Sequence, residues 1–257
     1  MKAVLTIAAS DSSCGAGVEV DTAVFRELGV YPLCAVTNVT AQDSRGVHKV
    51  FKVAPKIVAA QIDAVTRDFK PAACKIGMLY SPRMVDLAAD RIHRRELKNV
   101  ILDPVMKAKN GEVLLTETAI KRMKRRLIPR VDLITPNAYE AEVLTGIKIT
   151  DIASAHAAAE ALVDMGASAA LVKGGHIEGD PIDVLFDGTS FHDFTGKRMD
   201  KHMHGTGCAL SAAIAARLAL GDSLLAAIEF AKDYVTKAIE HSIRLGKGRM
   251  DYFTGSQ

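Results

Sequence analysis

Residues 72–106, AACKIGMLYSPRMVDLAADRIHRRELKNVILDPVM, contain the structural unit that repeats along this chain. Two short apolar runs, 72–79 and 99–106, are bounded by polar or turn-forming residues and predict strands. The segment between them, 82–97, has apolar residues at helical spacing and predicts a helix. A strand, a helix and a second strand in this order indicate a βαβ unit, in which the two strands are parallel.

The same alternation extends over the rest of the chain and predicts an α/β fold with a mainly parallel sheet. Further strands are predicted at 3–10, 32–42, 132–137 and 168–175. Further helices are predicted at 15–28, 55–69, 116–128, 138–145, 151–165, 207–220 and 222–245. Two segments break the alternation: 46–53 is interpreted as a small flap, and 181–194 as an antiparallel edge with a two-residue turn at Asp187-Gly188. No linker-like tract interrupts the pattern, so we expect a single domain over 1–257.

Composition limits the class of protein. With 257 residues, 49% of them hydrophobic, the chain can bury a sizeable core. Its 33 basic and 30 acidic residues are too balanced to indicate nucleic acid or a membrane surface as the main partner, and we interpret the basic run 121–126 as a solvated helix face. No apolar stretch approaches the roughly 20 residues that span a bilayer. The four cysteines form no CxxC pair, so we expect a soluble, cytoplasmic protein with reduced thiols.

Polar residues and glycines follow the predicted strands, and ligands of open parallel sheets bind beyond the carboxyl ends of the strands. This pattern favours a ligand cleft over a set of unrelated turns. The residues at these ends include Asp11, Gln42, Met78, Asp103, Asn137 and Lys173.

The turn Gly205-Thr206-Gly207-Cys208 precedes a helix rich in small apolar residues. Its glycines allow backbone N–H groups to converge, and the positive end of the helix dipole favours an anion there. The alternative is a plain glycine-containing turn into a buried helix. No Walker-type motif is present, and Gly15-x-Gly17 is only a fragment of a dinucleotide fingerprint.

Phosphoryl transfer needs oxygen ligands for Mg²⁺ and a group that accepts a proton. Asp103, Asn137 and Glu140 are suitable oxygen ligands, although Glu140 is equally suited to complementing a helix dipole. Lys173 is suited to neutralising a nucleotide phosphate, or is a surface residue at a strand end. Cys208 at a helix start is expected to have a lowered pKa and to act as a base, the alternative being an inert small hydrophobe. We interpret His202 and His204 as ordinary surface residues.

An ordered set of motifs resembles one enzyme family. The segments AVLTIAASDSSCGAG, TAQ, KIGM, LDPVM, LITPN, KGGH and HGTGC occur in this order. They are similar to those of the hydroxymethylpyrimidine and phosphomethylpyrimidine kinases of thiamine biosynthesis, which belong to the ribokinase-like superfamily. The resemblance implies a three-layer α/β/α fold, a homodimer, and Mg²⁺ with ATP as phosphoryl donor.

The resemblance also implies roles for individual residues. Gln42 would hydrogen-bond the aminopyrimidine, in a substrate pocket with Ala9, Asp11, Ala16, Met78 and Val105. Gly205, Thr206 and Gly207 would form the anion hole, with Cys208 in the catalytic position. Lys173, Gly175 and Thr206 would bind the nucleotide, and Asp103, Asn137 and Glu140 the metal.

The implied reaction is phosphorylation by ATP of 4-amino-5-hydroxymethyl-2-methylpyrimidine phosphate, and of the free alcohol before it. Two alternatives stay open: a pyridoxal or pyridoxine kinase of the same family, and a non-catalytic pyrimidine-binding regulatory protein. The chain departs from the family pattern at Ala9 and Cys14, which are usually glycine, at Asp43, and in the tail after Gly248. These departures concern substrate preference.

Overall fold

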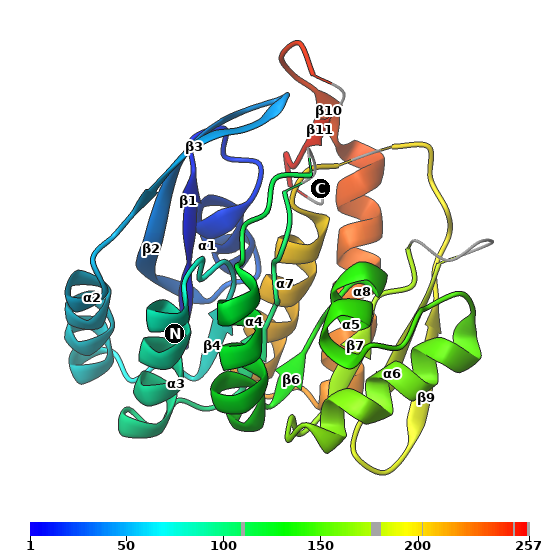
Figure 1. Cartoon of the computed structure of the whole chain (residues 1–257). Helices are drawn as coiled ribbons and strands as arrows, with labels where there is room; N and C mark the ends of the chain where they lie inside the picture. Colours follow the sequence, from blue (N-terminus) through cyan, green and yellow to red (C-terminus); the bar gives the residue numbers. More distant parts are fainter. Residues whose placement is uncertain (109–110, 176–180, 202, 249, 256–257) are drawn as a thin grey trace.

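The computed structural model describes residues 1–108, 111–175, 181–201, 203–248 and 250–255 (Figure 1). Within these residues, nine strands form one sheet in the order β3-β2-β1-β4-β5-β6-β7-β8-β9. The strands are β1 (Ala3–Asp11), β2 (Tyr31–Asp43), β3 (Gly46–Lys52), β4 (Ala73–Ile76), β5 (Val100–Leu102), β6 (Leu133–Ile134), β7 (Ala170–Val172), β8 (Ile182–Phe186) and β9 (Phe191–Thr195). The central six are parallel, whereas β3, β8 and β9 are antiparallel to their neighbours.

Helices cover both faces of the sheet. On one face lie α1 (Gly17–Glu27), α7 (Thr206–Leu220) and α8 (Leu224–His241). On the other lie α2 (Pro55–Asp68), α3 (Pro82–Arg94), α4 (Glu117–Arg122), α5 (Ala138–Thr145) and α6 (Ile152–Asp164). Successive side chains of a strand point to opposite faces, so Val100 and Leu102 join one core and Ile101 the other. The three-layer α/β/α prediction is confirmed.

Several predicted boundaries are wrong for local reasons. β4 and β5 are shorter than the apolar runs, because the strands end at Ile76 and Leu102 and the last residues of each run, 77–79 and 103–106, lie beyond them. The helix predicted at 116–128 becomes α4, a π turn at Met123–Leu127 and a 3₁₀ turn at Ile128–Arg130, where Pro129 lacks the N–H that an α-helix needs.

The predicted flap and edge hairpin are both present, as β3 paired with β2 and as β8 paired with β9. The hairpin turn is longer than expected. Phe186 pairs with Phe191, so residues 187–190 form the loop, and the Asp187 carboxylate accepts from the backbone N–H groups of Thr189 and Ser190. A two-stranded sheet in the tail, β10 (Ile243–Arg244) with β11 (Asp251–Tyr252), was not predicted.

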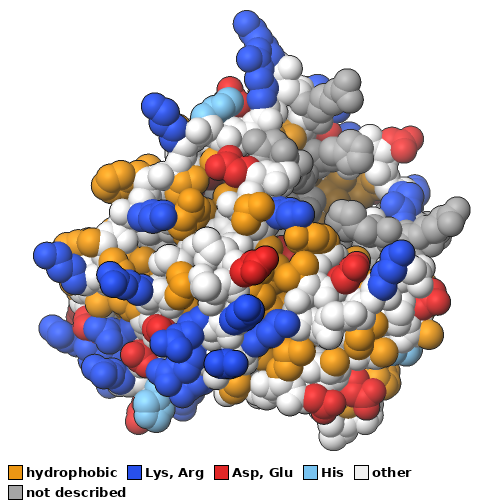
Figure 2. Space-filling model, viewed as in Figure 1, with side chains coloured by type: hydrophobic (Ala, Val, Ile, Leu, Met, Phe, Trp, Pro, Cys, Tyr) orange, Lys and Arg blue, Asp and Glu red, His pale blue; other side chains and the backbone are white. Residues whose placement is uncertain are grey.

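Basic side chains gather over α3 and α4 on the face seen in Figure 2, interspersed with acidic ones. Arg122 lies 2.8 Å from Asp86, and Arg126 lies 3.1 Å from Asp90. These cross-helix ion pairs agree with the interpretation of residues 121–126 as a solvated helix face. No described helix has the length and apolar character needed to cross a membrane.

Candidate active site

A cavity of about 840 Å³ runs along the carboxyl edge of the parallel strands. Every residue that sequence analysis assigned to substrate, nucleotide, metal or catalysis lines this cavity: Ala9, Asp11, Ala16, Gln42, Met78, Asp103, Val105, Asn137, Glu140, Lys173, Gly175, Gly205, Thr206, Gly207 and Cys208. The tertiary fold therefore brings residues from distant parts of the chain into one site.

The start of α7 faces this cavity and explains why the preceding turn needs glycine. Gly205 has a φ of 77°, in the left-handed region, and a Cβ there would lie 2.1 Å from the carbonyl oxygen of Gly15. At Gly207 a Cβ would lie 3.1 Å from Nζ of Lys173. No side chain among the described residues caps the helix. Its first N–H groups therefore remain available to an anionic ligand.

Cys208 lies in the first turn of α7, and its sulfur accepts a hydrogen bond from the backbone N–H of Gly17. Burial raises the pKa of this thiol to about 11; the Lys75 cation opposes the rise, whereas Asp103 and Asp21 add to it. The expectation of a lowered thiol pKa is therefore wrong for the ligand-free protein. Loss of water around the sulfur outweighs the favourable charges.

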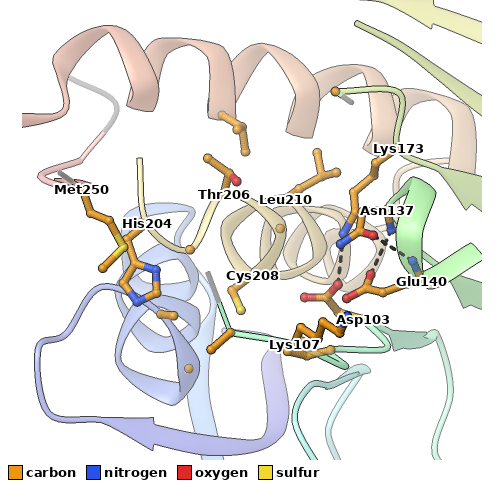
Figure 3. Close-up of a pocket in the computed structure, with 18 of the residues that line it drawn as sticks. Asp103, Lys107, Asn137, Glu140, Lys173, His204, Thr206, Cys208, Leu210 and Met250 are labelled. Atoms are coloured by element: carbon orange, nitrogen blue, oxygen red, sulfur yellow. Dashed lines mark hydrogen bonds and ion pairs between the residues drawn. The ribbon is translucent and has the colours of Figure 1, made fainter. Parts of the chain in front are cut away.

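Lys173 is not the surface residue that a strand-end lysine often is. Its side chain is only 15% exposed, and Nζ donates to Oδ1 of Asp103 over 3.1 Å (Figure 3). Burial alone would lower the pKa of Lys173, but the Asp103 and Glu140 carboxylates outweigh it and raise the pKa above its ordinary value. A permanent positive charge thus lies beside Gly207 at the start of α7.

Asn137 and Glu140 begin α5 through a reciprocal capping box. The Asn137 side chain accepts from the N–H of Glu140, and the Glu140 carboxylate accepts from the N–H of Asn137, each over 2.9 Å. Burial raises the pKa of Glu140 to about 7, opposed by Lys173 and reinforced by Asp103. Both readings of Glu140 thus apply, since it complements the helix start and also faces the cavity.

The donor set at this end of the cavity fits Mg²⁺. Among the described residues, no three His, Cys, Asp or Glu side chains form a metal-binding group. Mg²⁺, however, commonly uses one or two carboxylates and completes its shell with water and substrate phosphates. Asp103 and Glu140 supply two carboxylates close enough to disfavour each other's charge, which a cation would relieve.

The other end of the cavity is more apolar. Ala9 and Met78 are buried with Leu114, and Val105 packs against them. The polar exceptions come from the ends of β1 and β2, where Oδ2 of Asp11 lies 3.2 Å from the terminal amide of Gln42. Cys14, where the family usually has glycine, has a φ of 55°, a conformation that glycine adopts without strain.

Several residues of the cavity are not predicted from the sequence. His204 is only 8% exposed and contacts both Asp11 and Gln42, so the surface interpretation is wrong. A signal was present for Lys75, because a lysine within the buried strand ACKI requires a partner. Other residues that line the cavity and were not predicted include Lys107, Lys197, Arg198, Lys201, Lys232 and Met250. His176 and His202 lie outside the described residues.

Comparison with known proteins gives a consistent result. The family model described as phosphomethylpyrimidine kinase matches residues 11–252. The hydroxymethylpyrimidine/phosphomethylpyrimidine kinase of Bacillus subtilis is 44% identical over 247 residues, which cover 95% of this chain and 91% of the relative. The thiamine biosynthesis bifunctional protein ThiED of Geobacter sulfurreducens is also 44% identical, over 95% of this chain and 50% of its own length.

Solved structures share the fold. The ADP complex of Bacillus subtilis pyridoxal kinase superimposes with a TM-score of 0.91 at 33% identity. The match covers 99% of this chain and 98% of that structure.

Proposed function

This chain belongs to the phosphomethylpyrimidine kinase family, and on that premise we propose that its cavity transfers a phosphoryl group from ATP to 4-amino-5-hydroxymethyl-2-methylpyrimidine phosphate, in thiamine biosynthesis. The free hydroxymethylpyrimidine is the substrate of an earlier transfer. The observation that carries the assignment is the uncapped start of α7, placed between the apolar end with Gln42 and the charged end with Lys173.

Catalysis in this arrangement rests on position and charge. The N–H groups of Thr206, Gly207 and Cys208 stabilise the charge that develops on the transferred phosphoryl group, and Lys173 adds a fixed cation. Asp103 and Glu140, with Asn137 at the helix start, would hold Mg²⁺. When bound, the ion neutralises phosphate oxygens and orients the chain of phosphates.

The role of Cys208 differs between the two transfers. An alcohol must lose its proton to attack, whereas a phosphate monoester carries ionised oxygens at neutral pH. The raised pKa keeps the thiol protonated in the ligand-free protein, so a base role requires the thiolate to be favoured once ligands are bound. Cys208→Ala should therefore lower kcat for the alcohol far more than for its phosphate. An equal loss on both substrates would instead assign the thiol to positioning.

A pyridoxal kinase activity is the second candidate, favoured by the close superposition on the Bacillus subtilis pyridoxal kinase. The family model and the curated relatives favour the pyrimidine. A steady-state comparison of kcat/KM on hydroxymethylpyrimidine, its phosphate and pyridoxal tests the assignment, and a clear preference for pyridoxal would overturn it. Gln42→Ala should weaken pyrimidine binding by about 1–3 kcal/mol. Pyrimidine binding without ATP consumption would indicate the regulatory alternative.

Three wider expectations remain proposals: a single domain over 1–257, a cytoplasmic location and a homodimer. One continuous sheet supports the first. Exposed apolar side chains on β2 and β3, Val39 and Phe51, at 46% and 71% exposure, support a partner surface there. Sedimentation equilibrium of wild type and of Phe51→Glu tests the dimer.

A further inference from the structure

Three polar side chains from three segments meet at the apolar end of the cavity: Asp11 at the end of β1, Gln42 in β2, and His204 just before α7. Nε2 of His204 lies 3.1 Å from Oδ2 of Asp11 and 2.6 Å from the terminal amide atom of Gln42 placed as Nε2. His204 thus links the turn before α7 to the residue expected to recognise the substrate ring.

The Asp11 carboxylate determines which nitrogen of His204 carries the proton. Burial alone would raise the pKa of Asp11, but hydrogen bonds from His204 and from Ser13 outweigh it and hold the pKa below its ordinary value. Its Oδ1 already accepts from the N–H and the hydroxyl of Ser13. An ionised carboxylate only accepts. The His204 nitrogen that faces it, Nε2, must therefore be the donor.

The second ring nitrogen leads to the same assignment. Nδ1 of His204 is buried and has no hydrogen-bond partner within the part of the chain that the structure describes. A proton on Nδ1 would bury an unpaired N–H and turn a lone pair toward Asp11, and both cost free energy. With the proton on Nε2, the unpaired group is only an acceptor, which is tolerated more readily.

This assignment fixes the orientation of the Gln42 amide. The oxygen and nitrogen of an amide are distinguished by their partners. A donor 2.6 Å away requires an acceptor, so we assign Oε1 of Gln42 to the position beside His204. In this assignment the single Nε2–H of His204 is shared between Oδ2 of Asp11, 3.1 Å away, and Oε1 of Gln42, 2.6 Å away, and the 3.2 Å contact between Gln42 and Asp11 is no longer a hydrogen bond. The NH₂ group of the Gln42 amide is then left to donate to a ligand in the cavity.

The imidazole ring of His204 is held in place by its neighbours, as a donor that orients Gln42 must be. Its backbone N–H donates to the carbonyl of Asp251 over 2.7 Å, and the Tyr252 ring packs edge-on against it. On the other side, a Cβ at Gly15 would lie 2.2 Å from Cδ2 of His204. The tail strand β11 and the first turn of the chain therefore clamp the ring, and Met250 points toward it from the same tail (Figure 3).

We propose that His204 is a specificity-determining positioning residue, which Asp11 orients so that its Nε2–H holds Oε1 of Gln42 and leaves the Gln42 NH₂ group to donate to a ring nitrogen of the substrate. The substrate class selected is a heteroaromatic alcohol with an unprotonated ring nitrogen at that point. The proposal deepens the proposed function and rests on it.

The test compares His204→Phe, which removes the donor, with His204→Gln, whose amide restores an N–H. His204→Phe should raise KM for hydroxymethylpyrimidine ~10- to 100-fold, the usual effect of losing a buried hydrogen bond of 1–3 kcal/mol, with kcat and KM for ATP nearly unchanged. His204→Gln should recover most of the loss. Tyr252→Leu removes packing on the ring but no hydrogen bond of the cluster, so it should raise this KM by much less than His204→Phe does.

A double-mutant cycle separates this role from a structural one. If His204 acts through Gln42, His204→Phe should have little further effect on KM in a Gln42→Ala background. Equal effects in both backgrounds, or an effect of Tyr252→Leu that matches His204→Phe, would overturn the proposal. Calorimetric binding of hydroxymethylpyrimidine gives the same comparison without turnover. A wild type that binds this ligand but transfers no phosphate would instead contradict the proposed function.

Discussion

Nζ of Lys75 lies 3.0 Å from Oδ1 and 2.9 Å from Oδ2 of Asp21, and neither side chain has exposed surface. The pair connects β4 to α1 at the wall of the cavity, and the hydroxyl of Thr6 donates to the same carboxylate over 2.6 Å. Burial alone would lower the pKa of Lys75, but the surrounding groups, Asp21 first among them, together outweigh it and raise the pKa, so the lysine stays charged.

Removing the lysine should leave an uncompensated buried carboxylate. We expect Lys75→Met to lower the free energy of unfolding by about 3–5 kcal/mol, measured by urea denaturation. The matched control is Lys121→Met at an exposed helix position. This substitution should change the free energy of unfolding by less than about 0.5 kcal/mol. Similar values for the two variants would contradict a structural role for the ion pair.

Gly205 and Gly221 flank α7 and both have positive φ, yet only Gly205 is sterically confined. A Cβ at Gly221 meets nothing within 4 Å, whereas at Gly205 it meets the Gly15 carbonyl at 2.1 Å. Gly221→Ala should cost about 1 kcal/mol from backbone strain, and Gly205→Ala at least about 2 kcal/mol more. Thermal unfolding of both variants measures the difference. Equal losses of stability would show that the Gly15 carbonyl does not confine Gly205.

The reactivity of Cys208 should depend steeply on pH. In a Cys14→Ser, Cys34→Ser background, its alkylation by iodoacetamide should be slow at pH 7. The rate should rise about tenfold per pH unit until the pH approaches 11, because only the thiolate reacts and the pKa is about 11. In the urea-unfolded protein the pKa of the same thiol should be about 8.5. A rate that levels off near pH 7 in the folded protein would show that the thiol is activated without ligands.

Glu140 should make the ligand-free protein less stable as pH rises. Its folded-state pKa of about 7 exceeds the ordinary value. At pH values between these two pKa values, the folded state therefore binds more protons than the unfolded state does. The stabilisation present at low pH is therefore lost as pH rises through 7, by an amount on the order of 1–3 kcal/mol. Glu140→Gln, which keeps an oxygen for the N–H of Asn137, should lack this loss.

The control for this prediction is Glu142→Gln, an exposed position on the same helix. Urea denaturation at pH 5, 6.5 and 8 gives the comparison. If wild type, Glu140→Gln and Glu142→Gln show parallel pH profiles, the carboxyl is ionised throughout and the raised pKa is refuted.

The sequence was sufficient for the order of the main strands and helices and for the residues at the carboxyl ends of the strands that line the cavity. Apolar runs of strand length, alternating with helical periodicity, predict a parallel sheet, because the helices that connect parallel strands cover and bury both faces of the sheet. Polar residues after those runs then lie at one edge of the sheet. Asp103 and Asn137 are predicted in this way, whereas Gly205 is predicted from the glycine-containing turn before a helix.

Only the tertiary structure decided the chemical state of those residues. The expected thiolate of Cys208 is a protonated thiol, the expected surface residue His204 is a clamped donor, and Lys173 carries its charge against Asp103. Burial and charge partners set a pKa and the position of a proton, and these depend on side chains from segments far apart in the chain. A local pattern therefore specifies which groups reach the site, whereas the packing around them specifies which protons they hold.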